Sequence, residues 1–233
     1  MSTHLLAVVT TLLLSPPTLA QPPSDDELYQ RLMNGPDTVK ALEAALGQAD
    51  KISTLTLYLA AKTALQEDRL EDSAFLFYAA QLRARFDREC FPPQARGSAD
   101  PLVAYEPVSQ ALGGAINPQV MAKPKIFARA LARLEKWTPK APREYSPGYE
   151  FTERKTEPEA QKLAQQHRTE FISRMTGLSS LLNDEEYFAA FRVIQAQNLG
   201  DSDKRPTREA VDQATDIMKR LEKEKGLKGV FSK

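Results

Sequence analysis

The stretch from Leu70 to Pro93, LEDSAFLFYAAQLRARFDRECFPP, constrains the fold more than any other part of the chain. It contains four large apolar residues in direct succession, Phe75-Leu76-Phe77-Tyr78, inside a segment of helical character. Successive residues of an α-helix point about 100° apart, so this run covers more than one side of its helix. We therefore predict a helix over residues 71–88 at the centre of the fold, with neighbours on several faces. Phe91-Pro92-Pro93 ends it, because proline cannot continue a helix.

The rest of the chain also shows helical periodicity, with apolar residues recurring at spacings of three and four. Asp37 is suited to cap one helix, Pro124 to begin another, and Gly113-Gly114 to end a third. The segments with helical patterns are residues 24–33, 37–46, 50–65 or 53–65, 71–88, 124–137, 159–182, 185–198 and 206–225, and residues 102–112 are a further candidate. Strand-like alternation is absent from them, so the predicted fold class is all-α, with about seven or eight helices packed as antiparallel hairpins.

A proline-rich segment, residues 138–158, interrupts the helical pattern with the sequence TPKAPREYSPGYEFTERKTEP. Its Ser146-Pro147-Gly148-Tyr149 motif predicts a type II turn, with glycine where a positive φ is needed. We expect either an irregular loop or a short hairpin between helical regions 21–137 and 159–233, which together form one domain. We also predict that the aromatic residues flanking the turn contact a binding partner: Tyr145, Tyr149 and Phe151.

The first twenty residues have the pattern of a secretory signal peptide. They carry no Asp, Glu, Lys or Arg, and the apolar run from Leu5 to Leu14 is too short to span a membrane. Small residues up to Ala20 fit a cleavage site, although the amino-terminal region lacks the usual basic residue. The sequence therefore predicts cleavage of residues 1–20 and a periplasmic or secreted protein without a membrane span. An uncleaved amino-terminal anchor is the alternative.

The charge balance argues against a general nucleic-acid binder. The chain has 31 basic and 31 acidic residues and a formal net charge of zero. A protein that binds nucleic acid or an anionic membrane along its surface normally has a basic excess. We therefore expect the partner to be another protein or a peptide, while a local basic patch stays compatible with this composition.

Three arginines of the central helix, Arg83, Arg85 and Arg88, offer two interpretations. In the first, Arg83 lines an exposed polar edge of the helix together with Gln81, whereas Arg85 and Arg88 lie near its carboxy-terminal end, where cations interact favourably with the helix dipole. The alternative is a contact with an anion or an acidic partner. We include all three with the aromatic residues of the proline-rich segment as candidate partner-binding residues.

The inventory of reactive side chains is small. Beyond the first twenty residues there is one histidine, His167, and one cysteine, Cys90. A zinc site of the usual histidine and cysteine type cannot be built from these residues, and no cofactor is predicted. Cys90 fits a small apolar filler, with an intermolecular disulfide or a reactive thiol as the alternative. His167 lies on an apolar stripe, and its spacing from Glu170 suits a helical metal ligand only if further carboxylates face it.

Residues 55–88 form a helix, a polar turn and a second helix rich in alanine and aromatic residues. This pattern resembles one tetratricopeptide-like unit. It departs at Lys62 and Gln81, where such units have small residues, and no second unit follows at the same period. The positions that match the packing residues of the unit are Tyr58, Leu65, Ala74 and Tyr78. The resemblance implies a helical scaffold that binds other proteins or peptides, although arrays need about three units.

These observations favour an exported helical protein that acts by binding another protein, for example as an immunity or inhibitor protein. The alternative is a carboxylate-based hydrolase acting on envelope polymers or peptides. A concave pocket with at least two acidic groups near tyrosines would distinguish the hydrolase. An anchored structural protein is a third hypothesis, which depends on residues 1–20 staying in place.

Overall fold

The structure is a computed structural model, and it describes residues 22–198 and 205–227. The predicted signal peptide, residues 1–20, lies outside the described residues. Within them the fold is all-α, with nine α-helices and one short 3-10 helix. In chain order these are α1 (Asp25–Asn34), α2 (Thr38–Gly47), α3 (Thr54–Gln66), α4 (Leu70–Cys90), η1 (Gly97–Ala99), α5 (Tyr105–Met121), α6 (Pro124–Lys136), α7 (Glu157–Leu182), α8 (Glu185–Asn198) and α9 (Arg208–Glu224).

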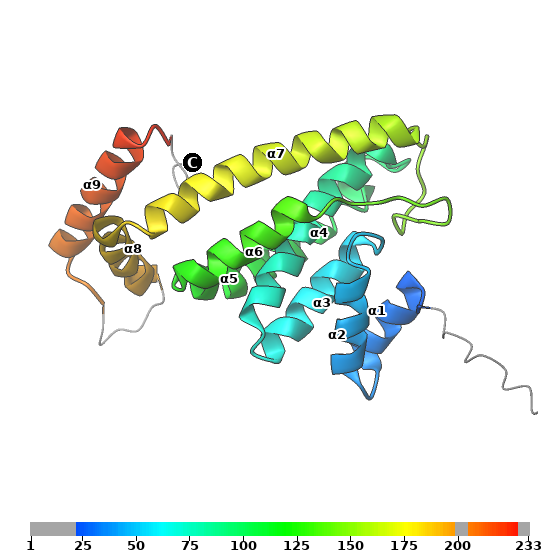
Figure 1. Ribbon diagram of the computed structural model, residues 1–233, viewed down its shortest axis with the longest axis horizontal. Coiled ribbons are helices and arrows are strands. Elements are labelled where there is room, and N and C mark those ends of the chain that lie inside the picture. The colour runs from blue at the N-terminus through cyan, green and yellow to red at the C-terminus, as the bar shows by residue number, and fades with distance from the viewer. Residues whose placement is uncertain (1–21, 199–204, 228–233) are drawn as a thin grey trace, which may run out of the picture.

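The predicted central helix is confirmed as α4. It forms an antiparallel hairpin with α3 and also packs against α5, α6 and α7 (Figure 1). Every residue from Ser73 to Ala80 is buried, so this helix is covered on all sides along two turns. Tyr78 lies among the rings of Phe77, Phe127 and Phe171, with centroid distances of 5.4–6.2 Å. The alanines of the same stretch let the neighbouring helices approach closely.

The fifth helix differs from its prediction. Gly113-Gly114 does not end it, and α5 continues to Met121 with Pro118 inside it. An interior proline removes one backbone hydrogen bond, and its ring crowds the carbonyl four residues earlier, at a cost of about 3 kcal/mol. Ile116 and Val120 are fully buried, and this packing offsets the cost.

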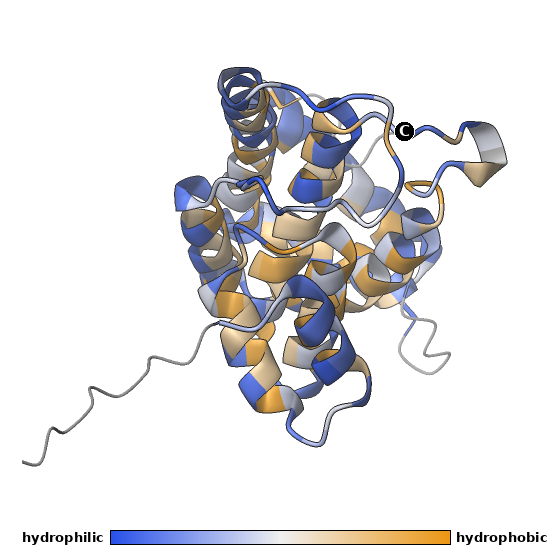
Figure 2. Ribbon diagram, turned by 90° about the vertical axis from the view of Figure 1, so that its right-hand side faces the viewer, coloured by the Kyte–Doolittle hydropathy of each residue, from blue (hydrophilic) through white to orange (hydrophobic). Residues whose placement is uncertain are grey.

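The long helix α7 lies along one side of the molecule and packs against α4 and α6 (Figure 1). The α1–α2 hairpin lies at one end and the α8–α9 hairpin at the other. Apolar positions of the ribbons face inward and hydrophilic positions face outward (Figure 2). Beside the main core there is a smaller apolar cluster under the proline-rich segment. It consists of Phe86, Cys90, Phe91, Tyr145, Ala160 and Ala164.

The proline-rich segment is an irregular loop and not a hairpin. It pairs instead with the chain that leaves α4, through an isolated antiparallel bridge between Pro93 and Phe151. Backbone hydrogen bonds extend this pairing, from Thr152 to Pro92 at 2.9 Å and from Lys155 to Cys90 at 3.0 Å. The φ of Gly148 is 85°, as the predicted type II turn requires. The loop is therefore fixed to the end of α4 along several residues.

None of the helices in residues 22–198 and 205–227 combines the length and the apolar character that crossing a membrane demands.

Candidate functional site

A buried arginine joins the proline-rich loop to the helical core. Arg83 of α4 is completely buried, and its guanidinium donates hydrogen bonds to the backbone carbonyls of Lys140, at 2.9 Å, and Asp50. The same guanidinium lies over the ring of Tyr145, 4.8 Å from its centroid. Lys140 and Asp50 are also linked by a backbone hydrogen bond and by an ion pair of 2.6 Å. Arg83 thus holds the loop before α3 and the proline-rich loop together.

Asp87, one turn further along α4, is the buried counter-charge of Arg83. Its Oδ1 lies 3.9 Å from Nη1 of Arg83, and its Oδ2 accepts hydrogen bonds from the hydroxyls of Tyr145, at 2.8 Å, and Thr54, at 3.2 Å. Burial raises the pKa of the Asp87 carboxyl to about 6. The charge of Arg83 and the two hydroxyl donors lower that pKa, and the charge of Asp25 raises it further. Desolvation therefore outweighs the ion pair at this carboxyl.

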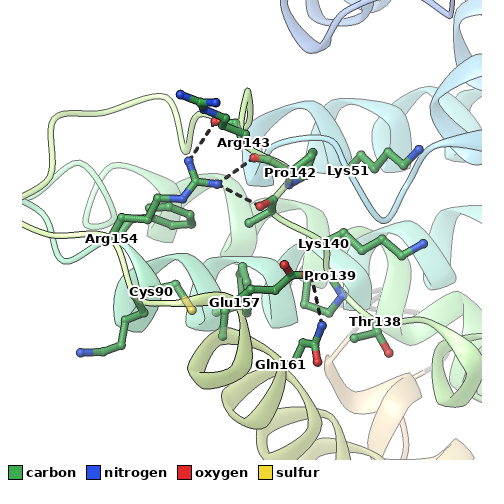
Figure 3. Close-up of a pocket in the computed structure, with 15 residues that line it drawn as sticks. Lys51, Cys90, Thr138, Pro139, Lys140, Pro142, Arg143, Arg154, Glu157 and Gln161 are labelled. Atoms are coloured by element: carbon green, nitrogen blue, oxygen red, sulfur yellow. Dashed lines mark hydrogen bonds between the residues drawn. The ribbon is translucent and has the colours of Figure 1, made fainter.

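A cavity of about 840 Å³, which we name the loop pocket, opens between the proline-rich loop and the ends of α4 and α7 (Figure 3). Its floor is apolar and includes Phe86, Cys90 and Phe91. Five basic side chains line it, against one carboxylate, that of Glu157. The basic residues are Lys51, Lys140, Arg143, Arg154 and Lys155.

The basic side chains of the loop pocket differ in how they are held. Arg154 donates hydrogen bonds to the carbonyls of residues 141–143 at 2.7–3.0 Å, so its charge is fixed in place without being neutralised (Figure 3). Lys155 pairs with Glu153 at 3.0 Å. Lys51 and Arg143 are exposed and make no ion pair within the described part of the chain. These two cations are available to an anionic ligand.

Two of the six predicted partner-binding residues are buried. Arg83 is completely buried and Tyr145 is 8% exposed, and both take part in the internal contacts above. The expectation that Arg83 lies on an exposed, polar side of its helix is therefore corrected. The physical reason is that the carbonyls of Asp50 and Lys140 replace the water that a guanidinium needs.

The other four predicted residues are at least partly accessible. Phe151 is 37% exposed and packs edge-on against Phe91, while the Tyr149 hydroxyl is buried without a hydrogen bond to a described residue. Arg85 lies over the ring of Phe171, and Arg88 pairs with Asp100 at 3.2 Å. None of the six lines the loop pocket. The predicted segment 138–158 contributes to a cavity, but through other residues than those predicted.

The residues that sequence analysis missed are the basic ones. Four of the five lie in the proline-rich segment itself, where Lys140, Arg143, Arg154 and Lys155 stand among its prolines and aromatics. Their presence was a usable signal, although Glu144, Glu150, Glu153 and Glu157 in the same segment balance it in a simple count. Lys51 had no such signal, because it comes from a distant loop.

Neither Cys90, which lines the loop pocket, nor His167 of α7 shows a reactive geometry. Cys90 is 1% exposed, and burial raises the pKa of its thiol to about 12. It fits the apolar filler interpretation, because a thiol with so high a pKa is a weak nucleophile. Nε2 of His167 lies 2.9 Å from Oε1 of Glu89 on α4. Within the described residues no group of three or more His, Cys, Asp or Glu side chains could hold a metal ion.

Comparison with known proteins gives no family. A scan of family models, a search of curated proteins and a search of solved structures found no match to this chain.

Proposed function

We propose that this protein is exported and acts by binding another protein, whose acidic segment enters the loop pocket. The observation that carries the proposal is the charge of that cavity. Five basic side chains line it against a single carboxylate, although the whole chain is neutral. Charges gathered in a concave site with low-dielectric walls focus their field on the ligand. The apolar floor formed by Phe86 and Phe91 would take an aliphatic or aromatic side chain of the same segment.

An immunity or inhibitor protein is the form of this function that we favour, since such a protein needs a binding surface and no catalytic group. The resemblance of residues 55–88 to a tetratricopeptide-like unit agrees with a helical scaffold for protein binding. The carboxylate-based hydrolase has less support. The loop pocket contains Glu157 as its only lining carboxylate and no lining tyrosine, so it lacks the acid pair that such chemistry requires.

Reversing the charges of Lys51 and Arg143, the two unpaired cations of the loop pocket, tests the binding proposal. We expect Lys51→Glu combined with Arg143→Glu to weaken binding of a fluorescein-labelled peptide of alternating glutamate and leucine by about tenfold or more. The reason is that two attractive charges become repulsive in one cavity. Fluorescence polarisation measures the affinity, and the wild-type affinity is expected to fall between about 0.05 and 0.3 M salt.

The matched control reverses two exposed cations elsewhere, with Lys62→Glu on α3 and Arg174→Glu on α7. It changes the net charge by the same amount and leaves the loop pocket unaltered. The control is expected to retain binding within about twofold. Equal loss in both double variants would show general charge attraction and would contradict a site at the loop pocket.

The export proposal rests on the pattern of residues 1–20. We expect the mature chain, recovered from the envelope or culture fluid of a cell that processes signal peptides, to begin at Gln21. Intact mass spectrometry measures this directly. A chain that still begins at Met1 in the same fraction would refute cleavage and favour the anchored structural protein.

A further inference from the structure

A second cavity lies at the other end of the molecule from α1 and α2. It has a volume of about 1030 Å³ and is lined by residues of α4, α5, α8 and α9, and we name it the distal groove. This volume is at the upper end of the roughly 300–1,000 Å³ that ligand sites occupy. Its floor is apolar and is formed by Phe77, Met121, Phe191, Ile194 and Met218. A hydrogen bond of 2.6 Å from Gln195 of α8 to the Pro118 carbonyl of α5 joins its two walls.

The polar residues of the distal groove are mainly side-chain amides: Gln81, Gln110, Asn117, Gln195 and Asn198. A side-chain amide offers two donor hydrogens and an acceptor oxygen, which matches the groups of a peptide main chain. Gln195 and Asn117 each use only part of this capacity, in bonds to Pro118 and Tyr78. A helical ligand would have its main-chain N–H and C=O groups bonded to each other, whereas an extended peptide leaves them free. The amides of the distal groove therefore suit an extended peptide.

The distal groove also contains a buried carboxylate. Glu222 of α9 is 9% exposed, and the Tyr187 hydroxyl donates to its Oε1 at 3.0 Å. Glu222 makes no ion pair within the described residues, and the other charged residue of the lining, Lys219, is exposed. A carboxylate in apolar surroundings is stabilised by a cation that shares its site. Charge complementarity therefore favours a ligand that places a positive charge beside Glu222.

We propose that the distal groove binds an extended peptide segment of a partner protein, with a lysine or arginine between apolar side chains. The apolar side chains lie on the floor around Phe77 and Met218, the cation pairs with Glu222, and the amides bond to the main chain. This site is separate from the loop pocket, and its ligand has the opposite charge. The two sites can therefore be tested independently.

The test uses the full mature chain and a fluorescein-labelled peptide, acetyl-Leu-Phe-Arg-Val-Leu-amide, in fluorescence polarisation. We expect Glu222→Gln to weaken binding of this peptide by about tenfold or more, because it removes the charge and keeps the acceptor for Tyr187. A peptide with norleucine in place of arginine is expected to bind both proteins equally. If Glu222→Gln changes neither affinity, or if a peptide with glutamate at that position binds as tightly as the arginine peptide, the proposal is wrong.

A blocking variant provides a test that does not depend on charge. A Cβ added at Gly114, which lines the groove, would meet nothing within 4 Å, so the side chain of Gly114→Phe begins in open space and its ring is expected to occupy the groove. We expect it to abolish binding of the arginine peptide. The matched control is Gly47→Phe at the end of α2, where an added Cβ also meets nothing within 4 Å. Retained binding in Gly114→Phe, or equal loss in Gly47→Phe, would overturn the proposal.

The chain's own carboxy-terminal residues 228–233 are the rival occupant, because they contain Val230, Phe231 and two lysines and follow Leu227, whose N–H donates to the Glu222 carbonyl. Truncation after Leu227 distinguishes a partner segment from the chain's own carboxy-terminal residues as the occupant of the distal groove. An unchanged peptide affinity supports a partner segment, whereas a rise of about tenfold would identify residues 228–233 as the occupant and overturn the proposal.

The Lys51→Glu, Arg143→Glu variant is expected to bind the arginine peptide like the wild type, so failure at either site is distinguishable from failure at the other.

Discussion

Replacement of Arg83 by methionine is expected to lower the free energy of unfolding by about 3–5 kcal/mol. Arg83 is completely buried, and its loss leaves Asp87 as a buried charge without its counter-charge. It also removes a hydrogen-bond donor from the carbonyls of Asp50 and Lys140. Urea unfolding followed by fluorescence measures the effect, because Trp137 is the only tryptophan and lies buried beside the proline-rich loop.

The control for this prediction is Arg88→Met on the same helix. Arg88 has a side chain that is 57% exposed and, among the described residues, forms an ion pair only with Asp100, so its loss is expected to cost about 1 kcal/mol or less. A second variant, Arg83→Met with Asp87→Leu, removes both charges and should be more stable than Arg83→Met alone. If Arg83→Met costs no more than Arg88→Met, the guanidinium is not part of the structural core.

The second large effect is a pH dependence of stability that comes from Asp87. Its pKa is about 6 in the folded protein and ordinary in the unfolded chain, so the folded state binds the proton more tightly. The contribution of this carboxyl to the free energy of unfolding is therefore fully present below about pH 4. It falls as the pH rises and levels off above about pH 6. The fall amounts to about 3 kcal/mol, because each unit of pKa corresponds to about 1.4 kcal/mol.

Asp87→Asn isolates this contribution, since the amide oxygen still accepts a hydrogen bond from Tyr145 or Thr54. The measurement is the difference between the unfolding free energies of wild type and variant at several pH values from about 4 to 7. Groups that both proteins share cancel in this difference. We expect the wild type to lose stability relative to Asp87→Asn as the pH rises. A flat difference, or one of the opposite sign, would show that the ion pair with Arg83 outweighs the desolvation of Asp87.

The predicted helices agree with the structure where the pattern of neighbouring residues determines where a helix begins and ends. The run Phe75-Leu76-Phe77-Tyr78 alone predicted a helix with neighbours on several faces, and α4 has them. The predicted bounds of α1 to α4 and of α6 to α9 agree closely with those observed, because spacing and capping are properties of consecutive residues. The prediction for α5 was wrong because the burial of Ile116 and Val120, which no local pattern contains, stabilises a helix through Pro118.

The candidate sites depended on contacts between distant segments. Arg83 reaches carbonyls 33 and 57 residues away in sequence, and Lys51 joins the loop pocket from before α3. On an isolated helix Arg83 resembles Arg85 and Arg88, and only the packed loops decide which of the three is buried. The distal groove likewise exists only where residues of α4 and α5 meet those of the α8–α9 hairpin, which are far apart in sequence.

The sequence by itself determined the all-α class, the central position of α4 and the interruption by the proline-rich segment. These follow from helical periodicity and from proline chemistry, which act over a few neighbouring residues. Only the tertiary structure decided which charges are buried and which line a cavity. The reason is that solvation of a side chain depends on every segment packed around it, and those segments meet only in the folded chain.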